Sequence, residues 1–142
     1  MSDAAAPLKN MKPEKEFFIG IDSDGCAFDT MEIKHKECFC PNFIEHFDMQ
    51  AVSKYAREVW EFVNLYSTTR GCNRFHAIIR VLELLGARPE VKARGVTPPK
   101  MEALKEWIKR ETKLGNPALI AEVERNPLPE LQHLLKWSLA VN

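Results

Sequence analysis

The sequence has no excess of either charge sign and no long apolar run. Its 20 basic residues balance 20 acidic ones among 142, so no net field draws the chain to nucleic acid or to an anionic membrane surface. No apolar stretch approaches the roughly 20 residues that cross a bilayer, and residues 1–16 lack the apolar core of a secretory signal. We therefore expect a cytoplasmic protein that binds neither nucleic acid nor membrane, with residues 1–16 as a disordered leader.

Cysteine is sparse as well. The four cysteines could form two disulfides, but a chain without an export signal is expected to keep them reduced. Cys38 and Cys40 lie two positions apart, with His35 and His46 nearby, which is one half of a metal-binding pattern. A zinc site usually needs a second, well-spaced pair of ligands, and this sequence has none. We interpret Cys38 and Cys40 as ordinary helix residues.

Only one segment has the pattern of a buried strand. Residues 17–21, Phe-Phe-Ile-Gly-Ile, form a short apolar run that ends in turn-forming residues. Nearly everything after Lys34 has helical periodicity instead. The predicted helices cover residues 52–66, 74–85, 97–114, 116–123 and 131–141, with Asn73 capping the second and Gly86 ending it. Three prolines and a glycine make residues 87–99 the expected long loop.

A lone strand of this type needs neighbours for its backbone and cover for its apolar faces. No later segment resembles a partner strand, and the chain stops inside an apolar helical pattern over residues 134–141. We therefore expect the 142 residues to be the N-terminal part of a longer protein, with its remaining strands beyond Asn142. The alternative is that the helices wrap a single extended segment.

Two carboxylates, Asp22 and Asp24, follow the predicted strand directly. At the carboxyl end of a parallel strand, side chains point into the crevice where open α/β sheets bind ligands. One carboxylate there can attack a phosphoryl group, and a second can transfer protons. Gly25 lets the backbone turn sharply and brings amides close to phosphate oxygens. Paired acidic groups beside a phosphate also suit Mg²⁺, which prefers oxygen ligands.

Residues 17–30, FFIGIDSDGCAFDT, resemble the first motif of the haloacid dehalogenase-like hydrolases: an apolar strand, then Asp-x-Asp-Gly, then often Asp-Ser/Thr. The resemblance implies an α/β, Rossmann-like core with a helical cap. It implies that Asp22 is the nucleophile, that Asp24 is the general acid and base, and that both residues hold Mg²⁺, Asp24 through its backbone carbonyl. Because the second Asp separates phosphatases from dehalogenases in this family, it also implies phosphoryl transfer. Cys26 departs mildly from the family, which usually has threonine or valine there.

The resemblance also implies how the chain is divided. Residues 17–33 would form the first core strand and the nucleophile loop, and residues 34–142 would form the helical cap region. The chain itself would then be mostly helical, one core strand followed by five or six helices, with the rest of the core absent. The later motifs of the family cannot be assigned to any residue of this sequence, so we expect these residues to be inactive alone.

The substrate implied by the resemblance is a small phosphorylated molecule. We expect Gly25 and Cys26 to contact its phosphate. Related enzymes often carry a basic-Gly-x-x-Arg stretch that contacts substrate, and Arg70, Gly71 and Arg74 match it loosely. The competing hypothesis is a helical binding module without catalysis, in which the Asp loop is vestigial. The remaining residues of note are expected to be structural or exposed: Trp60, Trp107 and Trp137 in the core, and His35, His46, His76 and His133 without triad-like company.

Overall fold

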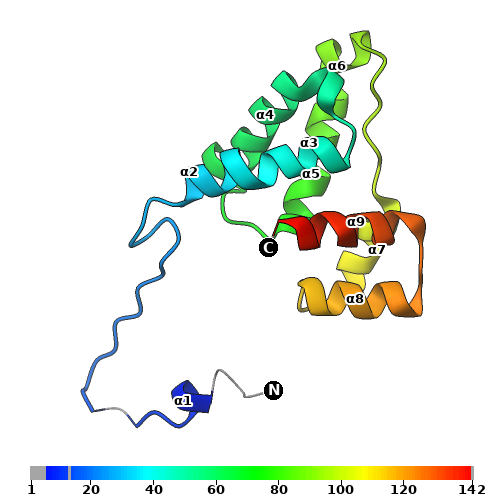
Figure 1. Ribbon diagram of the computed structural model, residues 1–142. Helices are drawn as coiled ribbons and strands as arrows, with labels where there is room; N and C mark the ends of the chain where they lie inside the picture. Colours follow the sequence, from blue (N-terminus) through cyan, green and yellow to red (C-terminus); the bar gives the residue numbers. More distant parts are fainter. Residues whose placement is uncertain (1–5, 13, 142) are drawn as a thin grey trace.

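The computed structural model describes residues 6–12 and 14–141, whose regular structure is helical (Figure 1). These residues contain no strand; their only extended pairing is an isolated bridge between Asp24 and Phe28. The predicted α/β class, with a core strand over residues 17–21, is therefore wrong for this chain. The strand fails because no neighbouring segment offers its backbone a hydrogen-bonding partner. Residues 1–5 and 13 of the expected leader lie outside the described residues.

The helices follow one another with short connections. Their bounds are α1 Ala6–Lys9, α2 Met31–Ile33, η1 Lys34–Phe39, α3 Cys40–His46, η2 Gln50–Val52, α4 Ser53–Glu61, η3 Phe62–Tyr66, α5 Arg74–Ala87, α6 Pro89–Ala93, α7 Glu102–Arg110, α8 Asn116–Arg125 and α9 Pro129–Ala140. The segments η1 and η3 are π-helical, and η2 is a 3-10 helix. Elements α2, η1 and α3 follow one another without a break, and η3 continues α4 in the same way.

Most of the predicted helices are present near their predicted bounds. Those over 52–66, 74–85, 116–123 and 131–141 correspond to α4 with η3, α5, α8 and α9. The third was misplaced at both ends, because α7 covers Glu102–Arg110 and not residues 97–114. The predicted loop over residues 87–99 contains the short helix α6. Gly86 lies inside the last turn of α5, with the ring of Pro98 3.7 Å from where its Cβ would be.

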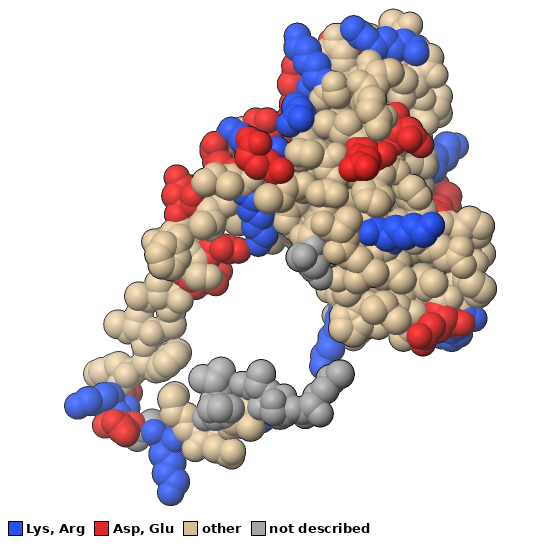
Figure 2. Space-filling view, viewed as in Figure 1, with Lys and Arg blue, Asp and Glu red and all other residues tan. Residues whose placement is uncertain are grey.

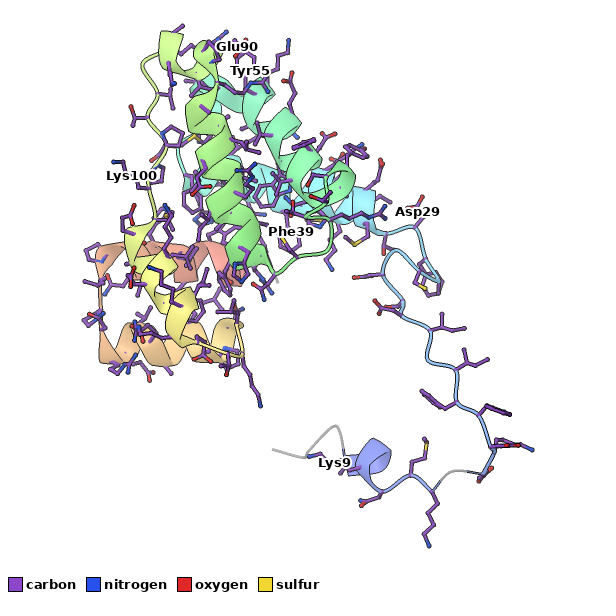
Figure 3. The ribbon with its side chains drawn as sticks, turned by 180° about the vertical axis from the view of Figure 1, so that it is seen from behind. Lys9, Asp29, Phe39, Tyr55, Glu90 and Lys100 are labelled. Atoms are coloured by element: carbon purple, nitrogen blue, oxygen red, sulfur yellow. The ribbon has the colours of Figure 1, made fainter. Side chains whose placement is uncertain are left out.

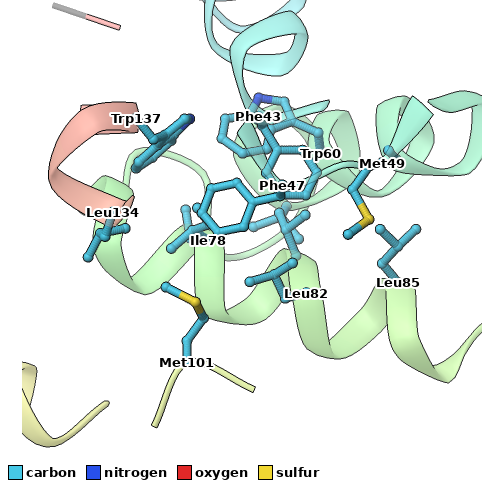
Figure 4. Packing of buried hydrophobic residues seen from close by; sticks show 14 of the residues in the cluster. Phe43, Phe47, Met49, Trp60, Ile78, Leu82, Leu85, Met101, Leu134 and Trp137 are labelled. Carbon is cyan, nitrogen blue, oxygen red and sulfur yellow. The ribbon is translucent and has the colours of Figure 1, made fainter. Parts of the chain in front are cut away.

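The main core lies where α3, α4 and α5 meet α9 (Figure 4). As predicted, all three tryptophans are buried in the core, along with the aromatic side chains of Phe43 and Phe75. Burying one large apolar side chain stabilises a fold by about 1.5–3 kcal/mol, so this cluster dominates the stability of the body. Helix α9 also packs against α7 and α8, which form the second part of the helical body.

Outside the body, residues 10–12 and 14–21 are exposed and have no regular secondary structure (Figure 3). Phe17, Phe18, Ile19 and Ile21 are 72–83% exposed, so the helices do not wrap this segment either. On the face shown in Figure 2, basic and acidic side chains are interspersed and neither sign forms a continuous patch. Among the described residues, no helix combines the length and the apolar character needed to cross a bilayer.

Candidate active site

The two aspartates lie in a tight loop that leads into the helical body. The amide of Ala27 donates to the Asp22 carbonyl at 3.2 Å. The amide of Phe28 donates to the Ser23 carbonyl at 2.9 Å, and the Phe28 carbonyl in turn accepts from the amide of Gly25 at 2.8 Å. The Oδ1 atom of Asp22 accepts a hydrogen bond from the Ser23 amide at 2.8 Å. These bonds give the loop a defined shape although no strand precedes it.

Gly25 brings this loop close to the helices. Its φ of +70° lies in the left-handed region that favours glycine. A Cβ at this position would lie 2.7 Å from Cγ of Met31 and 3.8 Å from Nη2 of Arg70. The loop therefore packs against the start of α2 and beside the guanidinium of Arg70, a residue that the sequence predicts to contact substrate.

Asp24 joins the loop to the first turns of the α2–η1 helix. Its Oδ2 accepts a hydrogen bond from Nζ of Lys34 at 2.7 Å, and its Oδ1 accepts one from Oγ1 of Thr30 at 2.9 Å. The hydrogen bond from Lys34, and then that from Thr30, hold the pKa of the Asp24 carboxyl below its ordinary value of 3.8. Asp24 is therefore ionised at neutral pH, and both of its carboxylate oxygens are occupied.

A cavity of about 330 Å³ lies between the loop and the helices. It is lined by Asp22 and Asp24 from the loop, Lys34 from η1, and Gly71 and Arg74 at the start of α5. Its size is at the lower end of the range for small-molecule sites, which run from about 300 to 1,000 Å³. Two carboxylates and two cationic side chains thus face one small cavity.

Arg74 is the half-buried cation of this cavity. Its Nη1 donates to the Ser138 carbonyl of α9 at 3.2 Å, and its guanidinium carbon lies 5.9 Å from the centre of the Phe39 ring. Burial lowers the pKa of this guanidinium, but an arginine keeps its charge at any physiological pH. Arg74 is therefore held in place by helices that are distant in the sequence.

The cavity brings together most of the site residues that the sequence predicts. Asp22, Asp24, Gly71 and Arg74 line it, and Gly25 and Arg70 lie next to each other at the loop. Cys26 is exposed and does not line the cavity. Sequence reasoning missed the cavity residues Lys34, His35, Asn64 and Cys72. No local pattern marks Lys34, because its contact with Asp24 arises from the loop folding back onto the helix ten residues later.

The described residues fit a Mg²⁺ ion only in part. They contain no group of three or more His, Cys, Asp or Glu side chains placed to hold a metal. The Asp24 carboxylate is already engaged by Lys34 and Thr30, which leaves the Asp22 carboxylate and the Asp24 backbone carbonyl as available oxygens. Mg²⁺ often takes only one or two protein oxygens and completes its shell with water and phosphate, so these two atoms would suffice as a partial shell.

No family model, curated protein or solved structure matches this chain. The geometry of this cavity and the resemblance of its loop are therefore the features that point to a function.

Proposed function

We propose that the cavity binds a small phosphomonoester and that Asp22 accepts its phosphoryl group, as the resemblance of residues 17–30 to the haloacid dehalogenase-like hydrolases implies. One observation supports this above the others: a loop carboxylate and two cationic side chains, Lys34 and Arg74, border a single small cavity. Lysine and arginine bind phosphate through charge-assisted hydrogen bonds. A carboxylate beside the bound phosphate can act as a nucleophile toward phosphorus.

The reaction proceeds in two steps in this proposal. An oxygen of Asp22 attacks phosphorus, the bond from phosphorus to the ester oxygen breaks, and the leaving alcohol takes up a proton. Water then attacks the aspartyl phosphate, loses a proton, and releases orthophosphate and the Asp22 carboxylate. Because Asp24 is ionised, the leaving alcohol takes its proton from solvent, and we assign the removal of the proton from the attacking water to Asp24. Because its pKa is lowered, Asp24 is ionised at neutral pH and ready to accept the proton of the attacking water.

The proposal includes Mg²⁺, held by the Asp22 carboxylate and the Asp24 carbonyl. Such an ion would withdraw charge from the phosphoryl oxygens. Lys34 and Arg74 also line the cavity, and their positive charges would stabilise the negative charge of the phosphoryl oxygens in the same way. We assign the activity to the cytoplasm, where the free thiols of the four cysteines would be maintained.

The test is whether Asp22 becomes phosphorylated. Because the later motifs of the family cannot be assigned to residues 1–142, we expect these residues to hydrolyse phosphomonoesters slowly at best. The assay therefore looks for the covalent adduct and not for turnover. The chain is incubated with acetyl phosphate and Mg²⁺, and mass spectrometry locates a hydroxylamine-sensitive phosphoryl group. We expect the adduct on the peptide that contains Asp22, and we expect Asp22→Asn to abolish it. Asp29→Asn, a matched change in the same loop outside the cavity, should keep it. No adduct in the unmodified chain, or the same adduct in Asp22→Asn, refutes the proposal.

A phosphate-binding module without chemistry is the second candidate. It is favoured by the Asp24 carboxylate, because a group with both oxygens engaged by Lys34 and Thr30 can serve purely to fasten the loop. The adduct assay and a calorimetric titration with orthophosphate together separate the two functions. Orthophosphate binding that depends on Arg74, measured by calorimetry in the absence of any adduct, favours the binding module.

A further inference from the structure

Four rings pack against one another beside the cavity. The centroids of Phe43 and Trp60 are 5.1 Å apart with planes inclined by 28°, and Trp60 is followed by Phe39 at 6.4 Å and 25°. The ring of His35 packs against both, with its centroid 5.3 Å from Phe39 at an interplanar angle of 29° and 6.3 Å from Trp60 at 44°. We call Trp60, Phe39 and His35 the aromatic stack, since these three line the cavity that also holds Asp22 and Asp24.

His35 is the most open ring of the aromatic stack. Phe43, Trp60 and Phe39 are buried in the core, where Figure 4 shows Phe43 and Trp60 close together, whereas His35 is half-buried. Burial lowers the pKa of His35, and the charge of Lys34 lowers it further, so its ring is neutral at pH 7. A neutral imidazole that lines the cavity beside two packed aromatic rings can stack with a further flat ring.

Two polar atoms of the aromatic stack have no hydrogen-bond partner among the described residues. They are Nδ1 of His35 and Nε1 of Trp60; within residues 6–12 and 14–141, one further buried side-chain nitrogen without a partner belongs to Trp137. Buried polar groups normally have partners, so two such atoms beside one cavity suggest a ligand with groups able to pair with them.

The helices around the aromatic stack have an unusual geometry. Both π-helical segments of the described chain border the cavity: η1 carries Lys34, His35 and Phe39, and η3 carries Asn64. The side chain of Asn64 is buried and donates to the Trp60 carbonyl at 2.9 Å. Short π-helical segments occur frequently at functional sites, because the extra residue per turn redirects side chains.

From these observations we propose that the cavity selects phosphomonoesters whose alcohol part is an aromatic ring, with that ring stacked on His35 and the phosphate held by Lys34 and Arg74. The inference rests on the proposed function for the position of the phosphate and adds the class of substrate. The cavity of about 330 Å³ suits a single ring or a small ring system and not a polymer.

The experiment compares two ligands of similar size, phenyl phosphate and cyclohexyl phosphate, by isothermal titration calorimetry with the 142-residue chain. One stacked pair is worth about a threefold to tenfold preference, so we expect phenyl phosphate to bind tighter by that factor. His35→Ala should remove the preference, and His35→Phe should retain it because a ring remains. His76→Ala, an exposed histidine on α5, is the matched control and should leave the preference unchanged. Circular dichroism of each variant checks that it is folded.

Equal affinity for the two ligands overturns the inference, as does a preference that survives His35→Ala or disappears in His35→Phe. These outcomes are distinct from failure of the proposed function. An Asp22 adduct without a preference for phenyl phosphate leaves the phosphoryl transfer standing and overturns the aromatic selectivity. A preference that depends on His35, without any adduct, supports the selectivity and refutes the transfer.

Discussion

At the scale of single residues, the site depends on how closely the Asp loop approaches the helices. The Asp24 carboxylate ties the loop to Lys34 and Thr30 over 2.7 and 2.9 Å. The aspartate and the lysine are each more than 40% exposed, so solvent screens this ion pair and its effect on global stability is small. Its main effect is therefore positional: it keeps the Lys34 ammonium group at the cavity.

Replacing Gly25 by alanine tests this approach directly. Alanine in the left-handed region costs about 1–2 kcal/mol, and its Cβ would meet Met31 at 2.7 Å, so the loop must shift. We expect orthophosphate to bind about tenfold more weakly, since a tenfold change corresponds to about 1.4 kcal/mol, and calorimetry measures it. The free energy of unfolding should hardly change, because this loop lies outside the helical core and can shift without disturbing it.

Gly95→Ala is the matched control for backbone strain. Gly95 also has a positive φ, +68°, but a Cβ there would meet no atom within 4 Å, and the residue lies outside the cavity. It should lower stability by about 1–2 kcal/mol and leave orthophosphate affinity unchanged. Unchanged affinity in Gly25→Ala would show that the position of the loop does not matter for binding.

At the scale of elements, local signals predict most helices near their bounds but misplace α7. Asn73 caps α5 as predicted, with Oδ1 accepting from the Phe75 amide at 3.0 Å. Thr97 and Pro98 have the same kind of local pattern, yet α7 begins only at Glu102. What stabilises that start is Glu130 of α9, which accepts from the Leu104 amide at 2.8 Å. A contact between residues 26 positions apart leaves no trace in a local pattern.

Asn73 itself links two elements, since its Nδ2 donates to the Leu114 carbonyl at 3.0 Å while its Oδ1 caps α5. Asn73→Ala removes both bonds and should lower the free energy of unfolding by about 2 kcal/mol, about half from each. Asn73→Asp keeps the cap acceptor and loses only the amide donor, so it should cost about 1 kcal/mol. Urea denaturation followed by circular dichroism measures both. Equal losses in the two variants would mean that the cap contributes nothing.

At the scale of the whole molecule, the sequence predicted the helical body, the buried tryptophans and part of the cavity lining, and it failed at the strand. Residues 17–21 have the composition of a buried strand, but a strand exists only with a neighbour to share its hydrogen bonds. The helices needed no such distant partner, because an amphipathic helix satisfies its own backbone. The aromatic stack was missed because it depends on a contact between two helices. His35, Phe39 and Trp60 are brought together by the packing of η1 against α4, which no local pattern shows.

The stability of the whole molecule should depend on pH through His35. Burial holds the pKa of His35 below its ordinary 6.5 in the folded chain. Between that lowered pKa and 6.5, the unfolded chain binds more protons than the folded one. The free energy of unfolding therefore falls as the pH falls through this window, and the contribution of His35 is fully present above pH 6.5. Because His35 is only half-buried, we expect the effect to be at most about 1 kcal/mol. Urea denaturation at pH 7.5 and pH 5 measures it: the unmodified chain should lose more stability on acidification than His35→Gln, whereas the exposed His76→Gln should follow the unmodified chain. If His35→Gln and the unmodified chain lose the same free energy of unfolding on acidification, His35 is not shielded from solvent. The aromatic stack would then contain a ring that becomes charged at low pH as readily as any exposed histidine.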